Sequence, residues 1–279
     1  MAARKEFALP TELSRQELYE AIEERISRRR YHDIPLEEEE LSALRDDISP
    51  LEKELSLSRV VLSQEGFERA VKTIIGSYGL VTGASSFATI TAGVETDEFR
   101  ANVEAGILGE ALILAATNRG WHTCWVGGML EKGEIRKQLN LKDGEKVAAI
   151  TPVGVARDKL TLTEKLTQKV AGSRRRKPLE ELVESYRPEE YPSWVKTSLQ
   201  AARLAPSAVN KQPWRFQVDA EEEKITLSSS RQKANHGVSP YLDCGIALLH
   251  LLLGAGQELN QPTFKLLEPP AVAEVYYGG

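Results

Sequence analysis

The sequence predicts an α+β fold in which one structural unit occurs twice. Two segments, Glu104 to Ala116 and Asp243 to Ala255, are apolar on nearly all sides, which indicates helices buried inside the fold rather than lying on its surface. Short β-branched or alternating segments between the helical ones predict strands. The two apolar segments also begin alike, with an acid, a small residue and then Gly-Ile, at an offset of 139 positions.

The likeness of the two buried segments has two interpretations. Any two buried helices share aliphatic residues, so the likeness can be coincidental. A duplication would instead give two halves that pack like a symmetric dimer. The sequences after the two helices diverge, so the halves are not expected to be equivalent. On this reading residues 1–185 form a first half, residues 186–279 form a second half, and the two are intertwined.

The remaining elements are expected in the following order. The first half should contain helices at 12–24 and 37–47, strands at 57–61 and within 80–91, and a buried strand at 146–153 that Gly154 closes. A short helix should then end near Glu184. The second half should contain a helix at 194–204, a proline-rich turn at 205–213 and strands at 214–218 and 224–228, joined by a solvated hairpin turn at 221–223.

Composition narrows the class of protein. Apolar residues make up 41% and charged residues 28%, which is ordinary for a soluble globular chain, and the net charge of -5 disfavours binding to a nucleic-acid backbone. Two cysteines, Cys124 and Cys244, are too few for a disulfide framework, so we expect a reducing compartment. The first residues contain no apolar stretch of signal-peptide length, and the longest apolar run, Cys244 to Ala255, is broken by His250 and is shorter than the ~20 residues that span a bilayer. These features predict a cytoplasmic protein that acts on neither nucleic acid nor membrane.

The most specific stretch runs from Ala201 to Phe216. Pro206 and Pro213 stiffen a loop between a helix and a strand, and loops fixed on a rigid scaffold concentrate binding groups. Asn210 and Gln212 carry side-chain amides whose donors and acceptors match the polar edge of a flavin pyrimidine ring. An ordinary turn is the alternative interpretation.

The string from Ala205 to Trp214 closely resembles the "APSaxNxQPW" signature of the FMN-dependent nitroreductase family. In that family the loop of one subunit lies against the flavin held by the other. The resemblance implies that Pro206, Ser207, Ala208 and Asn210 contact the isoalloxazine and ribityl parts of FMN. It also implies that Gln212 to Trp214 support the loop.

A basic turn from Arg25 to Pro35 is similar to the family's amino-terminal "RxSxR-x-F-x-D-x-P" pattern. In an extended segment Arg25, Ser27 and Arg29 project to one side, so two guanidinium groups and a hydroxyl could converge on one phosphate. Arg29 could instead reach the pyrimidine edge of the flavin, where a cation stabilises the reduced ring. A solvated run of charges is the alternative.

Two further segments resemble the family. Arg174 and Arg176 precede Pro178 in a pattern similar to "K-x-R-x-P-L-E-E", whose basic residues bind the FMN phosphate, although a basic stretch before a helix is also a reasonable reading. The segment from Gly120 to Met129 is similar to "GL-x-x-x-W-I-G-G", which implies that Val126, Gly127 and Gly128 lie at flavin N5. Glycines suit that place because a backbone approaches a flat ring closely only where side chains are absent. A plain turn at a strand end remains the alternative.

Each of these motifs occurs once, the arginines and the glycine bend in the first half and the asparagine loop in the second. This resembles the fused, pseudo-dimeric branch of the family, with one flavin site per chain and a monomer allowed. The resemblance implies a three-layer α/β/α fold, FMN as cofactor, NADH or NADPH as reductant, and nitro, quinone or similar small acceptors reduced by ping-pong hydride transfer through flavin N5. A flavin-storage protein and a specialised, dehalogenase-type flavin enzyme are the alternatives.

The histidines and the acids of the buried helices complete the expectations. The four histidines form no catalytic triad or metal-ligand pattern, and no side chain is expected to act as a catalytic acid or base. His250 lies in an apolar helix and is expected to be a satisfied core residue. Glu104 and Asp243 are expected at helix starts, where a carboxylate suits the positive end of the helix.

Overall fold

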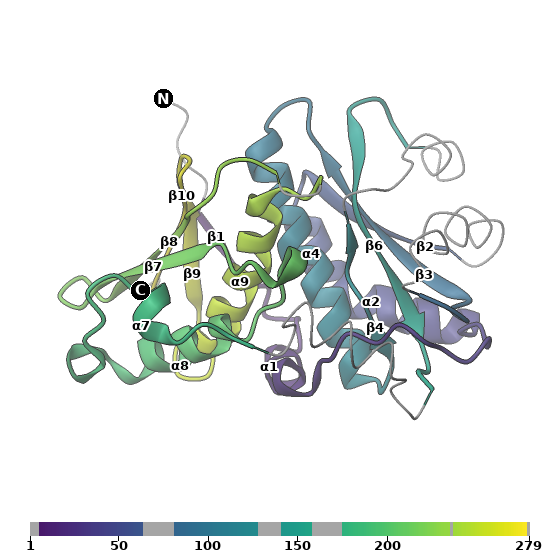
Figure 1. The fold of residues 1–279 in the computed structure, drawn as a ribbon, viewed down its shortest axis with the longest axis horizontal. Coiled ribbons are helices and arrows are strands. Elements are labelled where there is room, and N and C mark those ends of the chain that lie inside the picture. The colour runs from purple at the N-terminus through teal and green to yellow at the C-terminus, as the bar shows by residue number, and fades with distance from the viewer. Residues whose placement is uncertain (1–5, 64–80, 128–140, 158–174, 235–236, 278–279) are drawn as a thin grey trace.

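The chain folds into two antiparallel sheets with helices between them (Figure 1). The computed structural model describes residues 6–63, 81–127, 141–157, 175–234 and 237–277. One sheet has the order β2 (Ser58–Ser63), β3 (Ser86–Gly93), β6 (Glu145–Gly154), β4 (His122–Thr123), and β5 (Val126–Gly127) also pairs with β6. The other has the order β1 (Glu6–Ala8), β9 (Pro262–Leu266), β10 (Ala271–Tyr277), β8 (Lys224–Ser229), β7 (Trp214–Asp219).

The two predicted buried helices form the centre of the molecule. They are α4 (Glu98–Asn118) and α9 (Pro240–Ala255), and they pack against each other. α4 also packs on the β2-β3-β6 sheet and α9 on the β8-β10 sheet. Each helix therefore meets a sheet on one side and a helix on the other, which explains why it is apolar almost all round.

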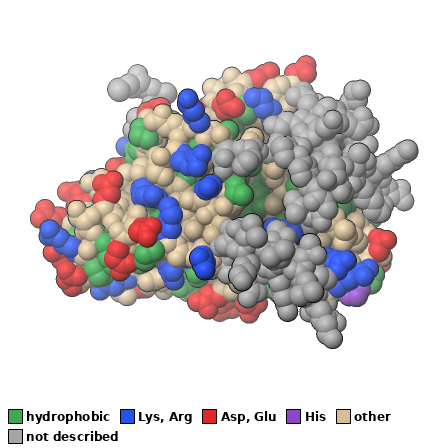
Figure 2. Space-filling model, viewed as in Figure 1, with side chains coloured by type: hydrophobic (Ala, Val, Ile, Leu, Met, Phe, Trp, Pro, Cys, Tyr) green, Lys and Arg blue, Asp and Glu red, His purple; other side chains and the backbone are tan. Residues whose placement is uncertain are grey.

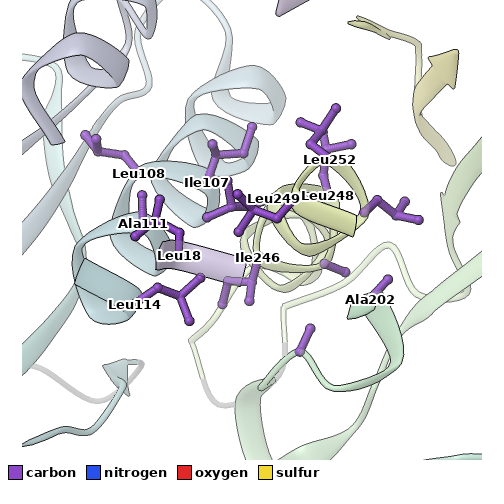
Figure 3. Close-up of a cluster of buried hydrophobic side chains, with 14 of the residues drawn as sticks. Leu18, Ile107, Leu108, Ala111, Leu114, Ala202, Ile246, Leu248, Leu249 and Leu252 are labelled. Carbon is purple, nitrogen blue, oxygen red and sulfur yellow. The ribbon is translucent and has the colours of Figure 1, made fainter. Parts of the chain in front are cut away.

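The mixed α+β class expected from the sequence is confirmed. Among the described residues, the two central helices lie between the two sheets (Figure 1). Figure 3 shows the resulting core, with side chains of α4 and α9 meeting Leu18 from α1 and Ala202 from α8.

The crossing of α4 and α9 is reciprocal. A Cβ atom on Gly106 would collide with the carbonyl oxygen of Leu242, and one on Gly245 would collide with that of Val103. Both pairs are related by the same offset of 139 positions found in the sequence. Gly106 meets Leu242 of α9, and their counterparts Gly245 and Val103 meet in the same way. Such a reciprocal contact is the pattern of a two-fold interface.

The outer helices cover this centre. α1 (Arg15–Glu24) packs on α4 and α9, α2 (Glu38–Glu54) packs on α4 and β2, and α8 (Ser193–Arg203) packs on α9. α2 is longer than predicted because it continues through Pro50, with Leu51 buried beyond it. The helix expected to end near Glu184 is a single turn, α7 (Leu179–Leu182).

Segments far apart in the sequence pair at both edges of the second sheet. β1, from the amino-terminal end, forms an edge of the sheet built by carboxy-terminal strands, with Phe7 paired to Phe264. Val183 forms an isolated bridge with Phe216 on the other edge. The boundary between residues 185 and 186 stays a prediction. Within the described part of the chain, none of the helices combines the length and apolar character that crossing a membrane requires.

Two buried acids differ in their position. Asp243 lies in the first turn of α9, as expected. Glu104 does not begin its helix, because α4 starts at Glu98 with Asp97 as its N-cap. Glu104 instead accepts hydrogen bonds from the backbone N–H of Leu57, at 2.7 Å, and from Nε of Arg100, at 2.6 Å. It is a structural brace between α4 and the start of β2.

Candidate functional site

The arginine turn (Arg25 to Pro35) lies beside β4, the strand that precedes the glycine bend at Val126–Gly127. Ser27 bridges Thr123 in parallel, and the N–H of Arg28 donates to the carbonyl of Thr123 at 2.9 Å. Arg28 is buried, and its guanidinium contacts the carbonyl oxygen of Arg157. The hydroxyl of Tyr31 donates to the carbonyl of Arg28 at 2.7 Å. Arg28 therefore fixes the turn through bonds within the protein. Arg25, Ser27 and Arg29 remain the candidates for binding a ligand.

Arg25, Ser27 and Arg29 all act on the thiol of Cys124. Burial raises the pKa of the Cys124 thiol, while the positive charges of Arg29 and Arg25 and a hydrogen bond with Ser27 oppose that rise. The charges of Arg25 and Arg29 are therefore near enough to act on the Cys124 thiol. That the three side chains share one face of the turn stays a prediction.

Arg25 meets a buried acid of the central helix. The Arg25 side chain is 8% exposed, its Nε lies 3.7 Å from Oε1 of Glu110, and that Nε makes no hydrogen bond to any described residue. Glu110 is fully buried and accepts a hydrogen bond from Nε1 of Trp125 at 2.7 Å. Nε2 of His250 lies 3.1 Å from Glu110, and Nδ1 of His250 lies 3.0 Å from the carbonyl oxygen of Ala201. His250 is therefore a satisfied core residue, as expected.

Arg176 is bonded to the asparagine loop. Its Nε and Nη2 donate to the carbonyl of Leu204 at 3.2 and 3.1 Å, and its Nη1 donates to Oδ1 of Asn210 at 3.3 Å. Burial and the positive charges of Arg25 and Arg203 together lower the pKa of Arg176 to about 10, while Glu110 opposes them. The charges of Arg25 and Glu110 are thus near enough to act on Arg176.

The asparagine loop, from Ala205 to Pro213, has an unusual backbone, and hydrogen bonds fix it at several points. Val209, Asn210 and Gln212 have φ values of 48°, 53° and 48°. These values lie in the left-handed region, which residues other than glycine adopt uncommonly. The N–H of Gln212 donates to Oγ of Ser207 at 2.9 Å, and the N–H of Ala208 donates to Oδ1 of Asp243 at 2.9 Å. Residues in such strained conformations persist only where the surroundings fix them, and they cluster at functional sites.

The side-chain amides of the loop bind protein groups. Nδ2 of Asn210 donates to the carbonyl of Arg175 at 2.9 Å, and the N–H of Lys177 donates to Oε1 of Gln212 at 2.8 Å. Gln212 and Trp214 are buried, so both are placed to support the loop. The amides fasten the 175–177 segment to the loop, and this explains how Arg176 is positioned.

The glycine bend pairs with β6, and its neighbouring residues come from α4 and from the segment before α9. Val126 and Gly127 pair with Ile150 and Ala149 of β6. A Cβ atom on Gly127 would lie 2.9 Å from Cγ2 of Val238, just before α9. A Cβ atom on Gly109 of α4 would collide with the ring of Trp125. Residues of both halves therefore fix the position of the bend.

The sequence of the chain matches the model of a protein family described as "Putative TM nitroreductase", over residues 17–255. The chain belongs to this nitroreductase family. The crystal structure described as a "putative nitroreductase" from Thermotoga maritima MSB8 shares the fold, with 22% identity, 94% of each chain covered and a TM-score of 0.61. The nitroreductase-like fold expected from the motifs is therefore confirmed.

Other solved structures match only part of the chain. An FMN-dependent nitroreductase from Clostridium difficile R20291 is 18% identical over 50% of this chain and 88% of its own, with a TM-score of 0.43. A nitroreductase with bound FMN from Desulfitobacterium hafniense DCB-2 is 20% identical over 52% of this chain and 91% of its own, also with a TM-score of 0.43. No curated protein sequence matches the chain significantly.

In this member of the nitroreductase family, the residues expected at the cofactor come from three segments. Arg25, Ser27 and Arg29 belong to the arginine turn, and Arg176 donates to Asn210 of the asparagine loop. Pro206, Ser207, Ala208 and Gln212 belong to the same loop, while Val126 pairs with β6 and Gly127 lies close to Val238 in front of α9. Arg174 and Gly128 lie outside the described residues.

Glu110 is a site residue that the sequence patterns did not predict. It lies in a largely apolar helix, yet it contacts Arg25, Trp125 and His250. The available signal was the charge itself, because an acid is almost never fully buried unless it is paired. Leu249 stands at the equivalent position of the second buried helix.

Proposed function

We propose that the region bounded by the arginine turn, Arg176 and the asparagine loop binds FMN, and that the chain is an NAD(P)H-dependent flavin oxidoreductase. The observation that carries the proposal is a set of contacts between distant segments: Arg176 donates to Asn210, and Arg25 meets Glu110, whose partner His250 lies against Ala201 of α8, just before the loop. The chain belongs to a nitroreductase family, which supports the proposal.

The charges of this region suit a phosphate. Arg25 and Arg176 are largely buried close to one another, with Glu110 as the nearby buried acid. Nε of Arg25 makes no hydrogen bond to a described residue, although an arginine N–H buried away from water normally finds an acceptor. A phosphate dianion would supply acceptors and offset the repulsion between the two guanidinium groups. The residues present therefore fit the phosphate end of FMN.

Other residues of the chain suit the ring. The glycine bend at Val126–Gly127 can offer a backbone N–H where no side chain intervenes. The loop from Pro206 to Gln212 is fastened to Asp243 and to the 175–177 segment, so it can form a rigid wall. Bound FMN would supply the redox chemistry, exchanging hydride with NADH or NADPH and with a nitro, quinone or similar small acceptor.

Replacing Arg25 with alanine tests the phosphate site. We expect Arg25→Ala to weaken FMN binding by about 1.5–3 kcal/mol, the range of a hydrogen bond to a charged group. The measurement is titration of the apoprotein with FMN, followed by the quenching of flavin fluorescence. Arg45→Ala, on the exposed surface of α2, is the matched control and should leave the affinity unchanged.

Three outcomes separate the competing functions. Equal FMN affinity for the Arg25→Ala variant and the wild type would show that Arg25 is not at the site. A wild-type chain that stays colourless with added FMN would overturn the proposal as a whole. Tight FMN binding without steady-state NAD(P)H oxidation above the rate of free flavin would indicate a storage protein instead of a reductase.

A further inference from the structure

A shallow pocket with a basic rim lies beside the asparagine loop. It is a hollow open to solvent, and Ala208 and Pro213 of the loop form part of its wall. Residues that precede or begin α9 form the rest, together with three basic side chains from two separate segments. The residues that matter for its chemistry are Lys211, Arg231, Lys233, Val238, Pro240 and Asp243.

The rim is positive in a protein whose net charge is -5. Lys211, Arg231 and Lys233 are exposed, and none of them forms a salt bridge with an acid among the described residues. The positive region extends to Lys177, whose pKa is lowered by burial and by the charges of Arg215 and Lys211. Figure 2 shows Lys and Arg side chains gathered on this face, over the half that carries β7, β8 and α9. Such a cluster attracts anions from solution.

The one acid that lines the pocket is already engaged. Asp243 is 4% exposed, and its Oδ1 accepts the N–H of Ala208 at 2.9 Å. It therefore braces the loop, and the charge of Arg231 acts on it. A single acid lines the hollow against three basic side chains, so the rim keeps a net positive charge. The amino-terminal end of α9, which begins at Pro240, adds the positive end of a helix dipole to the same pocket.

The pocket adjoins the site proposed for FMN. Val238 lines the pocket and also contacts Gly127, the residue of the glycine bend. Ala208 and Lys211 lie within two residues of Asn210 on the loop. A molecule held by the rim would thus have part of its length beside the glycine bend, where the reactive edge of the flavin is expected.

We propose that Lys211, Arg231 and Lys233 recognise a negatively charged group on a small molecule that reacts at the flavin. This inference rests on the proposed function. Two sources share the required chemistry: a phosphate group of the nicotinamide reductant, or a carboxylate on the acceptor. In both cases the anion is held at the rim while the reacting end lies towards Gly127.

The test removes two charges that lie outside the asparagine loop. Arg231→Gln/Lys233→Gln is compared with Arg45→Gln/Lys53→Gln, a control that removes one arginine and one lysine from the exposed surface of α2. Calorimetry with adenosine 2′,5′-bisphosphate and with 4-nitrobenzoate measures anion binding without turnover. We expect the pocket variant to lose at least about ten-fold in affinity for one of these probes, and the control to lose none.

Kinetics then identifies the source of the anion. If the rim binds the reductant, KM for NADPH rises at least about ten-fold in the pocket variant and KM for NADH rises less, with kcat and FMN affinity unchanged. If it binds the acceptor, KM rises for 4-nitrobenzoate and stays constant for nitrobenzene. Either effect should weaken as salt is added.

The outcomes separate this inference from the proposed function. Equal probe affinities and equal KM values in the pocket variant and the wild type, with FMN bound normally, would overturn the anion pocket alone. A wild-type chain that fails to bind FMN would overturn the proposed function. In that event the calorimetry still decides whether the rim binds an anion.

Discussion

Glu110 shows how one buried residue can organise a site. It contacts Arg25, which we place at the phosphate, and Trp125, which directly precedes the glycine bend. A buried charge is tolerated only when it is paired and hydrogen-bonded, and His250 provides the remaining partner. The arginine turn and the glycine bend are thus positioned by the same carboxylate.

Asp243 gives the chain a pH-dependent stability. Burial raises the pKa of Asp243 to about 7, against the opposing effects of the Ala208 N–H and the charge of Arg231. Because the pKa is higher in the folded than in the unfolded chain, its contribution to stability is present below about pH 4 and is lost as pH rises towards 7. The full change is up to about 4 kcal/mol.

Asp243→Asn should remove this dependence while its side-chain oxygen keeps the bond to Ala208. We expect the free energy of unfolding of the wild type to fall relative to that of the variant between about pH 4 and 7. Chemical unfolding of both proteins in parallel buffers measures the difference, and the comparison cancels the effect of other titrating groups. Curves for the two proteins that run parallel over this range would show that the Asp243 carboxyl ionises freely in the folded chain.

At the scale of elements, the crossing of α4 and α9 requires glycine at two positions. Each helix brings its backbone against the other at Gly106 and Gly245, where a Cβ would meet a carbonyl oxygen of the partner helix. The neighbouring atoms are backbone, which cannot move aside without separating the helices. Such an interface resembles a dimer contact more than an ordinary packing of side chains.

Gly106→Ala should therefore destabilise the fold by about 1–3 kcal/mol or more, the usual effect of overpacking a core. Denaturant unfolding measures the loss, and Gly245→Ala should give a similar value because the contact is reciprocal. Gly93→Ala is the control, since a Cβ there would lie 3.5 Å from its nearest neighbour, in ordinary contact. Helix propensity alone would make alanine at 106 stabilising, so an increase in stability would contradict the close crossing.

At the scale of the whole molecule, we propose that one chain forms the equivalent of a family dimer. The reciprocal glycine contacts at an offset of 139 positions support this, as does the pairing of distant segments at the edges of the second sheet. The halves are nevertheless unequal. Glu110 in the first half has Leu249 as its equivalent, so the polar cluster around Arg25 can form on one side only.

A fused pseudo-dimer should be a monomer with one FMN per chain. Light scattering coupled to size exclusion measures the mass, for which we expect about one chain of 31.0 kDa. Absorbance of FMN released from a known amount of protein gives the stoichiometry. Two flavins per chain would contradict the single site, and a stable dimer would contradict the idea that the interface is satisfied within the chain.

Local patterns determined much of this molecule. The two apolar segments were long enough to be recognised as central helices, and strands such as β7 and β8 alternate clearly. The short strands β1, β4 and β5 escaped prediction because a few residues carry too little periodicity, and they exist only through pairing with distant partners. The carboxy-terminal strands β9 and β10 were not predicted either.

For the site, the sequence by itself determined which residue types are available and which family motifs they follow, because these depend on neighbours along the chain. Only the tertiary structure decided that Arg25 meets Glu110, that Arg176 bonds Asn210, and that a basic rim lies close to the glycine bend. Pairings of this kind depend on how α4 and α9 cross. That crossing is set by close packing between residues more than a hundred positions apart, which no local pattern contains.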